Sequence, residues 1–166
     1  MSQTNKTCKI CHEVGHSKFY CKKRPAKPIQ AKTKKPKRPS RGAVVKELDS
    51  VFSQYIRLCA VDELGDTTCV TCGDTRPWKQ HQNGHFFTRG RYATRWDKDN
   101  CHVQCVKCNI MLHGNYIQYT KYMIDTYGRQ FIDKLEKKSF TPVKIPTSEL
   151  RDMIDEYKAK VALLKW

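Results

Sequence analysis

Two Cys-x-x-Cys pairs, Cys69/Cys72 and Cys105/Cys108, enclose a stretch of the chain that is rich in histidine and asparagine. Each dithiol supplies two thiolates, so the two pairs together complete the tetrahedral coordination that Zn²⁺ adopts in structural sites. Because all four positions are then filled, no substrate can reach the metal, and any chemistry must come from other residues. We therefore expect one structural zinc ion that joins two distant segments of the chain.

Imidazole and carboxamide groups are dense between the two pairs and just after them. These candidate residues are His81, Asn83, His85, Asn100, Asn109, His113 and Asn115. If residues 79–87 form a strand, the three candidates within it share one face, and a helix after the last cysteine would place Asn109 and His113 on one face. Histidine is a base near neutral pH, and hydrated Mg²⁺ needs few protein oxygen ligands. These residue types fit metal-dependent phosphodiester hydrolysis.

A second cluster near the N-terminus has the spacing C-x2-C-x4-H-x4-C. Its members are Cys8, Cys11, His16 and Cys21. The spacing resembles that of CCHC zinc knuckles, in which the metal supplies the folding free energy of a segment too short to fold on apolar burial. Phe19 and Tyr20 are available to stack on unpaired bases. The alternative is a structural zinc site without a role in nucleic-acid binding.

The charge of the chain favours a polyanionic partner. Lys and Arg number 32 against 16 Asp and Glu, a formal charge of +16, which two thiolate-rich zinc sites would lower to about +13. A protein this basic is expected to bind nucleic acid. No apolar run approaches the length of a membrane-spanning helix, and the polar N-terminus lacks a secretory signal. Cysteines in metal-ligand spacings indicate a reducing compartment, so we expect no membrane partner and a location in the cytoplasm.

Composition divides the chain into three regions: a zinc knuckle at 1–21, a linker at 22–42 and a larger domain at 43–166. The linker contains ten Lys or Arg, four Pro and no acidic residue, which is typical of a solvated, extended segment. Its charges would add affinity for nucleic acid through counterion release, without sequence preference.

The larger domain has the pattern of a small α+β fold with flanking helices. Hydrophobic periodicity predicts helices over 43–60 and 116–138, with a weak point or break at Gly128. Residues 66–115 have the short apolar runs and Gly, Asn and Cys content expected of a ββα zinc unit. Thr147 is a predicted N-cap of a last helix.

The order of these motifs resembles the HNH (His-Me finger) nucleases with a treble-clef zinc site, and most closely the NinG/Rap recombination endonucleases of lambdoid phages. The resemblance covers about residues 44–166. The matching segments are 69–73, 84–86, 95–97, Asn100, 104–109 and 113–115. It is also similar to phage endonuclease VII in placing an asparagine directly after the second Cys pair. The resemblance implies a ββα-metal nuclease core.

The resemblance also implies roles for individual residues. His85 would be the general base that activates water, Asn109 would hold a catalytic Mg²⁺ or Mn²⁺ through its side-chain oxygen, and Asn100 would brace the loop that orients the histidine. Family members act on branched DNA, so the implied substrates are Holliday junctions and D-loops. Host or phage recombination proteins are implied partners.

One position departs from the family pattern. Many HNH enzymes carry Asp or His directly before the catalytic histidine as a second metal ligand, but this chain has Gly84 there. Either Asn109 holds the metal with water alone, or His113, Asn83 or Asn115 completes the site, with His113 preferred.

Three arginines, Arg89, Arg91 and Arg95, are candidates to neutralise DNA phosphates. Symmetric cleavage of a four-way junction needs two active sites, which favours a homodimer. Two rival functions stand beside the branched-DNA nuclease: a non-catalytic zinc protein that binds single-stranded or branched nucleic acid, and a site-specific HNH homing or restriction-like nuclease.

Overall fold

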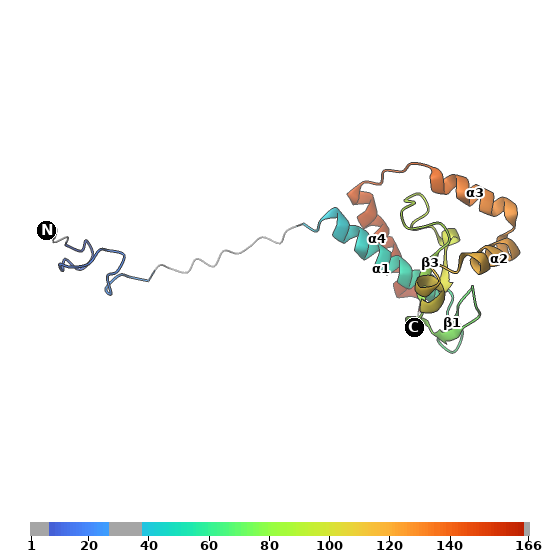
Figure 1. The fold of residues 1–166 in the computed structure, drawn as a ribbon, viewed down its shortest axis with the longest axis horizontal. Coiled ribbons are helices and arrows are strands. Elements are labelled where there is room, and N and C mark those ends of the chain that lie inside the picture. Colours follow the sequence, from blue (N-terminus) through green and yellow to red (C-terminus); the bar gives the residue numbers. More distant parts are fainter. Residues whose placement is uncertain (1–6, 27–37, 165–166) are drawn as a thin grey trace. The chain divides into compact units, whose positions relative to one another are not determined.

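The computed structural model describes residues 7–26 and 38–164, and the chain divides into two units, Met1–Arg38 and Pro39–Trp166 (Figure 1). The first unit contains the N-terminal Cys/His cluster, closed by an antiparallel bridge between Thr7 and Val14. Much of the expected linker, at 27–37, lies outside the described residues. The second unit contains every helix and sheet strand that the described part of the chain forms.

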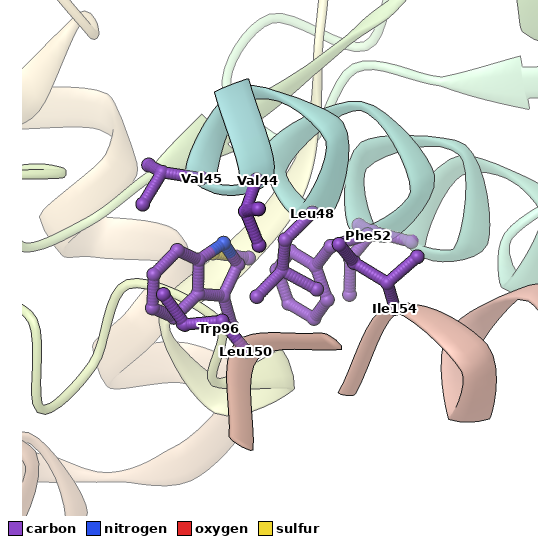
Figure 2. Packing of buried hydrophobic residues seen from close by; sticks show 9 residues of the cluster. Val44, Val45, Leu48, Phe52, Trp96, Leu150 and Ile154 are labelled. Carbon is purple, nitrogen blue, oxygen red and sulfur yellow. The ribbon is translucent and has the colours of Figure 1, made fainter. Parts of the chain in front are cut away.

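Two long helices, α1 (Arg41–Cys59) and α4 (Thr147–Leu163), pack side by side and build the larger core of the second unit (Figure 1). α1 begins where the Ser40 hydroxyl accepts a hydrogen bond of 3.3 Å from the Ala43 amide, a typical N-cap. Figure 2 shows the α1 side chains pointing toward those of α4, with Trp96 among them. The buried members of this core are Val44, Val45, Leu48, Phe52, Ile56, Trp96, Cys101, Leu150 and Ile154.

Two short antiparallel hairpins follow α1 in the chain. In the first, β1 (Asp66–Thr68) pairs with β2 (Thr75–Pro77). In the second, β3 (Gln82–His85) pairs with β4 (Cys101–Gln104). In the second hairpin His85 pairs with Cys101, so the two ends of the connecting segment, residues 86–100, lie next to each other and the segment forms a closed loop between β3 and β4.

A second core lies under α2 (Tyr116–Tyr127) and α3 (Arg129–Phe140). The two helices meet at Gly128, whose φ of 80° is a left-handed conformation that residues with a side chain rarely adopt. The buried members of this core are Phe86, Tyr119, Met123, Ile132 and Leu135. Phe86 follows directly on β3, so this core holds one end of the strand that carries His85.

Most of the predicted elements are confirmed in type, but the expected N-cap at Thr147 and one expected helix are wrong. The helix expected over 116–138 is interrupted at the predicted glycine, giving α2 and α3. Thr147 is not an N-cap, because it is already the first residue of α4, whose cap position is Pro146. The helix expected after the second Cys pair is only a π-helical turn, Lys107–Met111. The described chain is thus a mixture of helices and small antiparallel sheets, as an α+β class predicts.

Within the described residues, no helix combines the length and the apolar composition needed to cross a membrane. This agrees with the absence of a long apolar run in the sequence.

Candidate functional site: a polar cleft beside a four-cysteine cluster

The four cysteines of the two Cys-x-x-Cys pairs converge. Each offers one thiol, and the sulfur atoms of Cys69, Cys72, Cys105 and Cys108 all lie within 4.8 Å of one another. The first pair sits in the turn between β1 and β2, where Gly73 with a φ of 75° lets its amide donate to the Cys69 carbonyl at 2.9 Å. The second pair follows β4. Four thiolates at this spacing fit a closed structural zinc site, which would lock the first hairpin to the end of the second.

The polar surroundings of Cys69 favour a thiolate. Burial raises the pKa of the thiol, but hydrogen bonds from the Thr71 hydroxyl, 3.1 Å from the sulfur, and from backbone amides outweigh it and lower the pKa to about 7. Asn115 donates its amide to the Cys108 sulfur at 3.4 Å. Such hydrogen bonds to the sulfur atoms orient thiolates that bind zinc and stabilise their charge.

A cleft of about 410 Å³ lies between α1, β3 and the π-helical turn. Its lining is mostly polar and includes cations, carboxamides and one carboxylate. The lining residues are Asp49, Phe52, Ser53, Arg57, His81, Gln82, Asn83, His85, Arg89, Asn109 and Ile110. The structure therefore brings His85 and Asn109 into one cleft, although 24 positions separate them in the sequence.

His85 is held in one tautomer. Its Nε2–H donates to the backbone carbonyl of Arg95 at 2.9 Å, so Nδ1 carries the lone pair and can accept a proton. Burial lowers the pKa of His85 below its ordinary value, and the charge of Arg89 adds to this effect. The imidazole is therefore neutral at physiological pH, which is the state that a general base requires.

The loop that positions His85 is braced by Asn100, which is fully buried. Its Oδ1 accepts from the Phe87 amide at 2.7 Å, and its Nδ2 donates to the carbonyls of Phe87 and Thr94, each at 2.9 Å. One carboxamide thus ties the start and the middle of the loop to the residue directly before β4. Asn100 touches the backbone of the loop and not the cleft, so it is a positioning residue.

Asn109 lines the cleft together with Gln82. Its Nδ2 donates to the Gln82 Oε1 at 2.7 Å, and this bond uses the nitrogen and not the oxygen of the carboxamide. An amide oxygen is a ligand that Mg²⁺ accepts. Asn83, from the same strand as His85, has a buried Oδ1 without a hydrogen-bond partner among the described residues.

The packing around position 84 explains why this residue is a glycine. A Cβ at this position would lie 2.1 Å from the Gln104 Oε1, because Gln104 crosses the strand to donate from Nε2 to the Gly114 carbonyl at 2.8 Å. No side chain fits here, so this chain cannot place a metal ligand directly before His85. The departure from the family pattern is built into the packing of the second hairpin.

His113 does not belong to the cleft. The prediction that Asn109 and His113 share a helical face is wrong, because the π-helical turn ends at Met111 and His113 adopts a left-handed φ of 48°. His113 is exposed and absent from the cleft lining. Asn115 faces Cys108 instead, so of the three proposed second ligands only Asn83 lines the cleft.

The three predicted DNA-contacting arginines have different surroundings. Arg95 is held by Asp49 of α1, with Nε–Oδ1 and Nη2–Oδ2 distances of 2.9 and 2.6 Å. Arg91 stacks on Phe140, with 3.8 Å between the guanidinium carbon and the ring centre. Arg89 is exposed at the cleft. Arg95 is thus occupied inside the fold, and Arg89 is the one whose position best suits a phosphate.

Arg57 is a cleft residue that was not predicted from the sequence. Its guanidinium lies over the Trp78 ring, with 5.1 Å between the guanidinium carbon and the ring centre. It donates hydrogen bonds only to backbone carbonyls, including that of His81 at 3.3 Å. It forms no ion pair with the described residues. A partly buried cation without a carboxylate is suited to bind a phosphate. Arg57 follows Ser53 by four residues and Asp49 by eight, a helical spacing that puts all three on one face of α1, and this spacing was the available signal.

Two other histidines are structural. His81 is buried, with Nδ1 2.8 Å from the Thr67 hydroxyl. His102 lies between two tyrosine hydroxyls, those of Tyr119 and Tyr127, each 2.9 Å from a ring nitrogen.

The N-terminal cluster also converges. The ligand atoms of Cys8, Cys11, His16 and Cys21 lie within 4.8 Å of one another, and the Cys11 sulfur is 3.2 Å from the His16 Nε2. This donor set fits zinc. Phe19 and Tyr20 are mostly exposed beside it.

The fold and the site define a small α+β protein. It has two clusters of Cys and His side chains that can each hold zinc, and a polar cleft beside the second cluster. A family model described as "Bacteriophage Lambda NinG protein" matches residues 16–166. The chain belongs to the NinG family of lambdoid phage proteins. The match reaches further upstream than the resemblance seen in the sequence, through the linker and into the knuckle.

Several curated phage proteins are similar to this chain. "Protein ninG" of Escherichia phage 933W is 30% identical over 93 residues, covering 55% of this chain and 44% of the relative. "Protein ninG" of Salmonella phage P22 is 28% identical over 122 residues, covering 73% and 57%, and that of Escherichia phage lambda is 29% identical over 93 residues, covering 55% and 43%. The chain spans about half the length of these relatives. No solved structure matches the chain.

Proposed function

We propose that the protein is a metal-dependent DNA endonuclease with a His-Me finger core, acting on branched recombination intermediates such as Holliday junctions and D-loops. The observation that supports this most is His85: a neutral imidazole with its Nδ1 lone pair available, in a cleft that Asn109 and the cations Arg57 and Arg89 also line. A base, a hard ligand and two phosphate-binding groups are the requirements of phosphodiester hydrolysis.

In the proposed mechanism His85 accepts a proton from water at Nδ1 while the water oxygen attacks phosphorus. The bond from phosphorus to the leaving sugar oxygen breaks, and that oxygen takes a proton from solvent. The Arg95 carbonyl, which accepts from Nε2, stabilises the imidazolium that forms. Arg57 and Arg89 bind the phosphate and hold it in line with the attacking water.

The residues of the cleft fit Mg²⁺ or Mn²⁺. Asn109 Oδ1 would hold the ion, with Asn83 the nearest candidate for a second protein ligand and water completing the shell. The carboxylate of Asp49 is already occupied by Arg95 and Trp96. When bound, the ion would supply charge stabilisation at the phosphate and at the leaving oxygen.

The choice of substrate and partners rests on the family and on charge. The net charge of +16 favours DNA. Single-stranded regions of a branched substrate suit the knuckle, where Phe19 and Tyr20 are free to stack, and the basic linker would add affinity. We further propose that the protein acts as a homodimer in the cytoplasm of the bacterial host, in concert with host or phage recombination proteins.

A second candidate function is a zinc-dependent protein that binds single-stranded or branched DNA without cutting it. The exposed aromatic residues of the knuckle favour it, because they serve binding and not hydrolysis. The two functions differ in what the cleft does.

The test is cleavage of a synthetic four-way junction and of a linear duplex of the same sequence, with Mg²⁺ or with EDTA. Gel-shift binding in Ca²⁺ runs beside it. Metal-dependent cutting of the junction in preference to the duplex is the expected result. Tight junction binding without cutting, across Mg²⁺, Mn²⁺ and several branched substrates, would favour the binding protein instead.

A further inference from the structure

Exposed apolar side chains are concentrated in one short segment, Val106–Ile117. Met111 is 68% exposed and Ile117 is 73% exposed. The exposed apolar residues of this segment are Val106, Ile110, Met111, Leu112, Tyr116 and Ile117. So dense a group of water-exposed apolar side chains marks a surface that binds a partner.

The segment is held rigidly at its base. Cys105 and Cys108 belong to the four-cysteine cluster, and the Gly114 amide donates to the Cys108 carbonyl at 2.9 Å. Gln104 holds the carbonyl of Gly114 at 2.8 Å. The apolar side chains therefore project from a fixed prong, which we define as residues 106–117, and a fixed prong loses little entropy on binding.

The prong is continuous with the cleft. Asn109 and Ile110 lie in its first turn and also line the cleft next to His85. A DNA strand whose phosphate lay against His85 would pass beside the prong.

We propose that the prong packs against unstacked bases at a branch point and thereby selects branched DNA over linear duplex. This rests on the proposed function. Apolar side chains that enter a base step must compensate for the lost stacking, and a branch point offers bases whose stacking is already disrupted. The sequence around the prong suits DNA as well: residues 100–124 contain no Asp or Glu, and Lys107 and Lys121 are exposed.

A second copy of this chain fits the prong less well. In a twofold contact the same surface meets itself, so Lys107 and Lys121 of one copy would approach their equivalents, and the contact would cover the mouth of the cleft at Asn109. The phosphates of DNA neutralise these lysines instead.

The experiment compares the double variant Met111→Ser/Ile117→Ser with the wild type and with Leu64→Ser. Leu64 is 86% exposed in the turn before β1, outside the cleft and the prong. The Leu64→Ser variant is therefore a control for removing an exposed apolar side chain elsewhere on the surface. Binding is measured in Ca²⁺ for a four-way junction and for a linear duplex, with 2-aminopurine at the crossover to report base unstacking. Light scattering gives the oligomeric state.

The double variant is expected to bind the junction roughly tenfold more weakly, to lose the rise in 2-aminopurine fluorescence, and to bind duplex as the wild type does. Leu64→Ser is expected to keep all three properties. The proposal would be overturned if the double variant kept the junction preference and the 2-aminopurine fluorescence of the wild type. It would also be overturned if light scattering showed a change from dimer to monomer large enough to explain the weaker binding by itself. Because binding is measured without cleavage, loss of junction preference in a protein that never cuts would sustain the prong while refuting the nuclease.

Discussion

Asp49 lies on α1, far in sequence from the loop that orients His85, yet it holds that loop. Its carboxylate accepts from Arg95 at 2.9 and 2.6 Å and from the Trp96 indole at 2.9 Å, and the carbonyl of Arg95 accepts from His85. The substitution Asp49→Asn keeps the size of the side chain but removes its charge, and it places an amide NH₂ group against the guanidinium of Arg95. The substitution therefore tests whether α1 positions the histidine.

The magnitude follows from the burial of the ion pair. The side chains of Arg95 and Asp49 are 15% and 22% exposed, which places the pair between a surface ion pair, worth about 1 kcal/mol or less, and a buried one, whose disruption costs about 3–5 kcal/mol. We expect the variant to lose about 2–3 kcal/mol of unfolding free energy. Misorientation of His85 is expected to slow cleavage roughly 10- to 100-fold.

The assay combines thermal unfolding with a pH profile of junction cleavage. The charge of Asp49 raises the pKa of His85, so its removal is expected to move the acid limb of the profile to lower pH. Glu47→Gln is the matched control, since Glu47 lies on the same helix but pairs at the surface with Lys158. A melting temperature like that of the control, together with an unmoved acid limb, would refute the reasoning.

Three further predictions concern packing and metal. Cys105→Ser is expected to release one of two zinc ions per chain and to unfold the second unit, measured by metal analysis and circular dichroism; full zinc content with unchanged melting would exclude the four-thiolate site. Gly84→Ala is expected to lower the free energy of unfolding, measured with denaturant, by about 1–3 kcal/mol. The loss is expected to be much smaller in a Gln104→Ala background, because the added methyl group clashes with the Gln104 side chain. Equal losses in both backgrounds would contradict the predicted clash. Burial lowers the pKa of His102 from 6.5 to about 4, so its contribution is fully present above pH 6.5 and about 3 kcal/mol is lost as pH falls to 4. His102→Gln should flatten the pH dependence of stability over that range, and an unchanged slope would contradict the assignment.

Local patterns in the sequence were sufficient to predict the long helices and the two clusters of Cys and His side chains. The apolar period of 43–60 reflects one buried face of α1, and Gly128 interrupts a helix because of its own backbone freedom. Metal-ligand spacing is set by local turn geometry, so both Cys/His clusters could be found before any fold was known.

Contacts between distant segments could not be predicted in the same way. Arg95 looked like a DNA contact because its partner Asp49 lies 46 residues earlier. His113 looked like a ligand because a π-helical turn and a left-handed residue cannot be distinguished from a helix by spacing. Gly84 looked like a defect until the side chain of Gln104 was seen to fill its space.

The proposed general-base role of His85 is tested most directly by the single-turnover rate of junction cleavage in Mg²⁺, for wild type and His85→Ala at saturating enzyme. Loss of the base is expected to slow cleavage by about 10²- to 10⁴-fold, with junction affinity and melting temperature close to those of the wild type and partial recovery of the rate on adding imidazole. A variant that cuts at the wild-type rate would contradict the account.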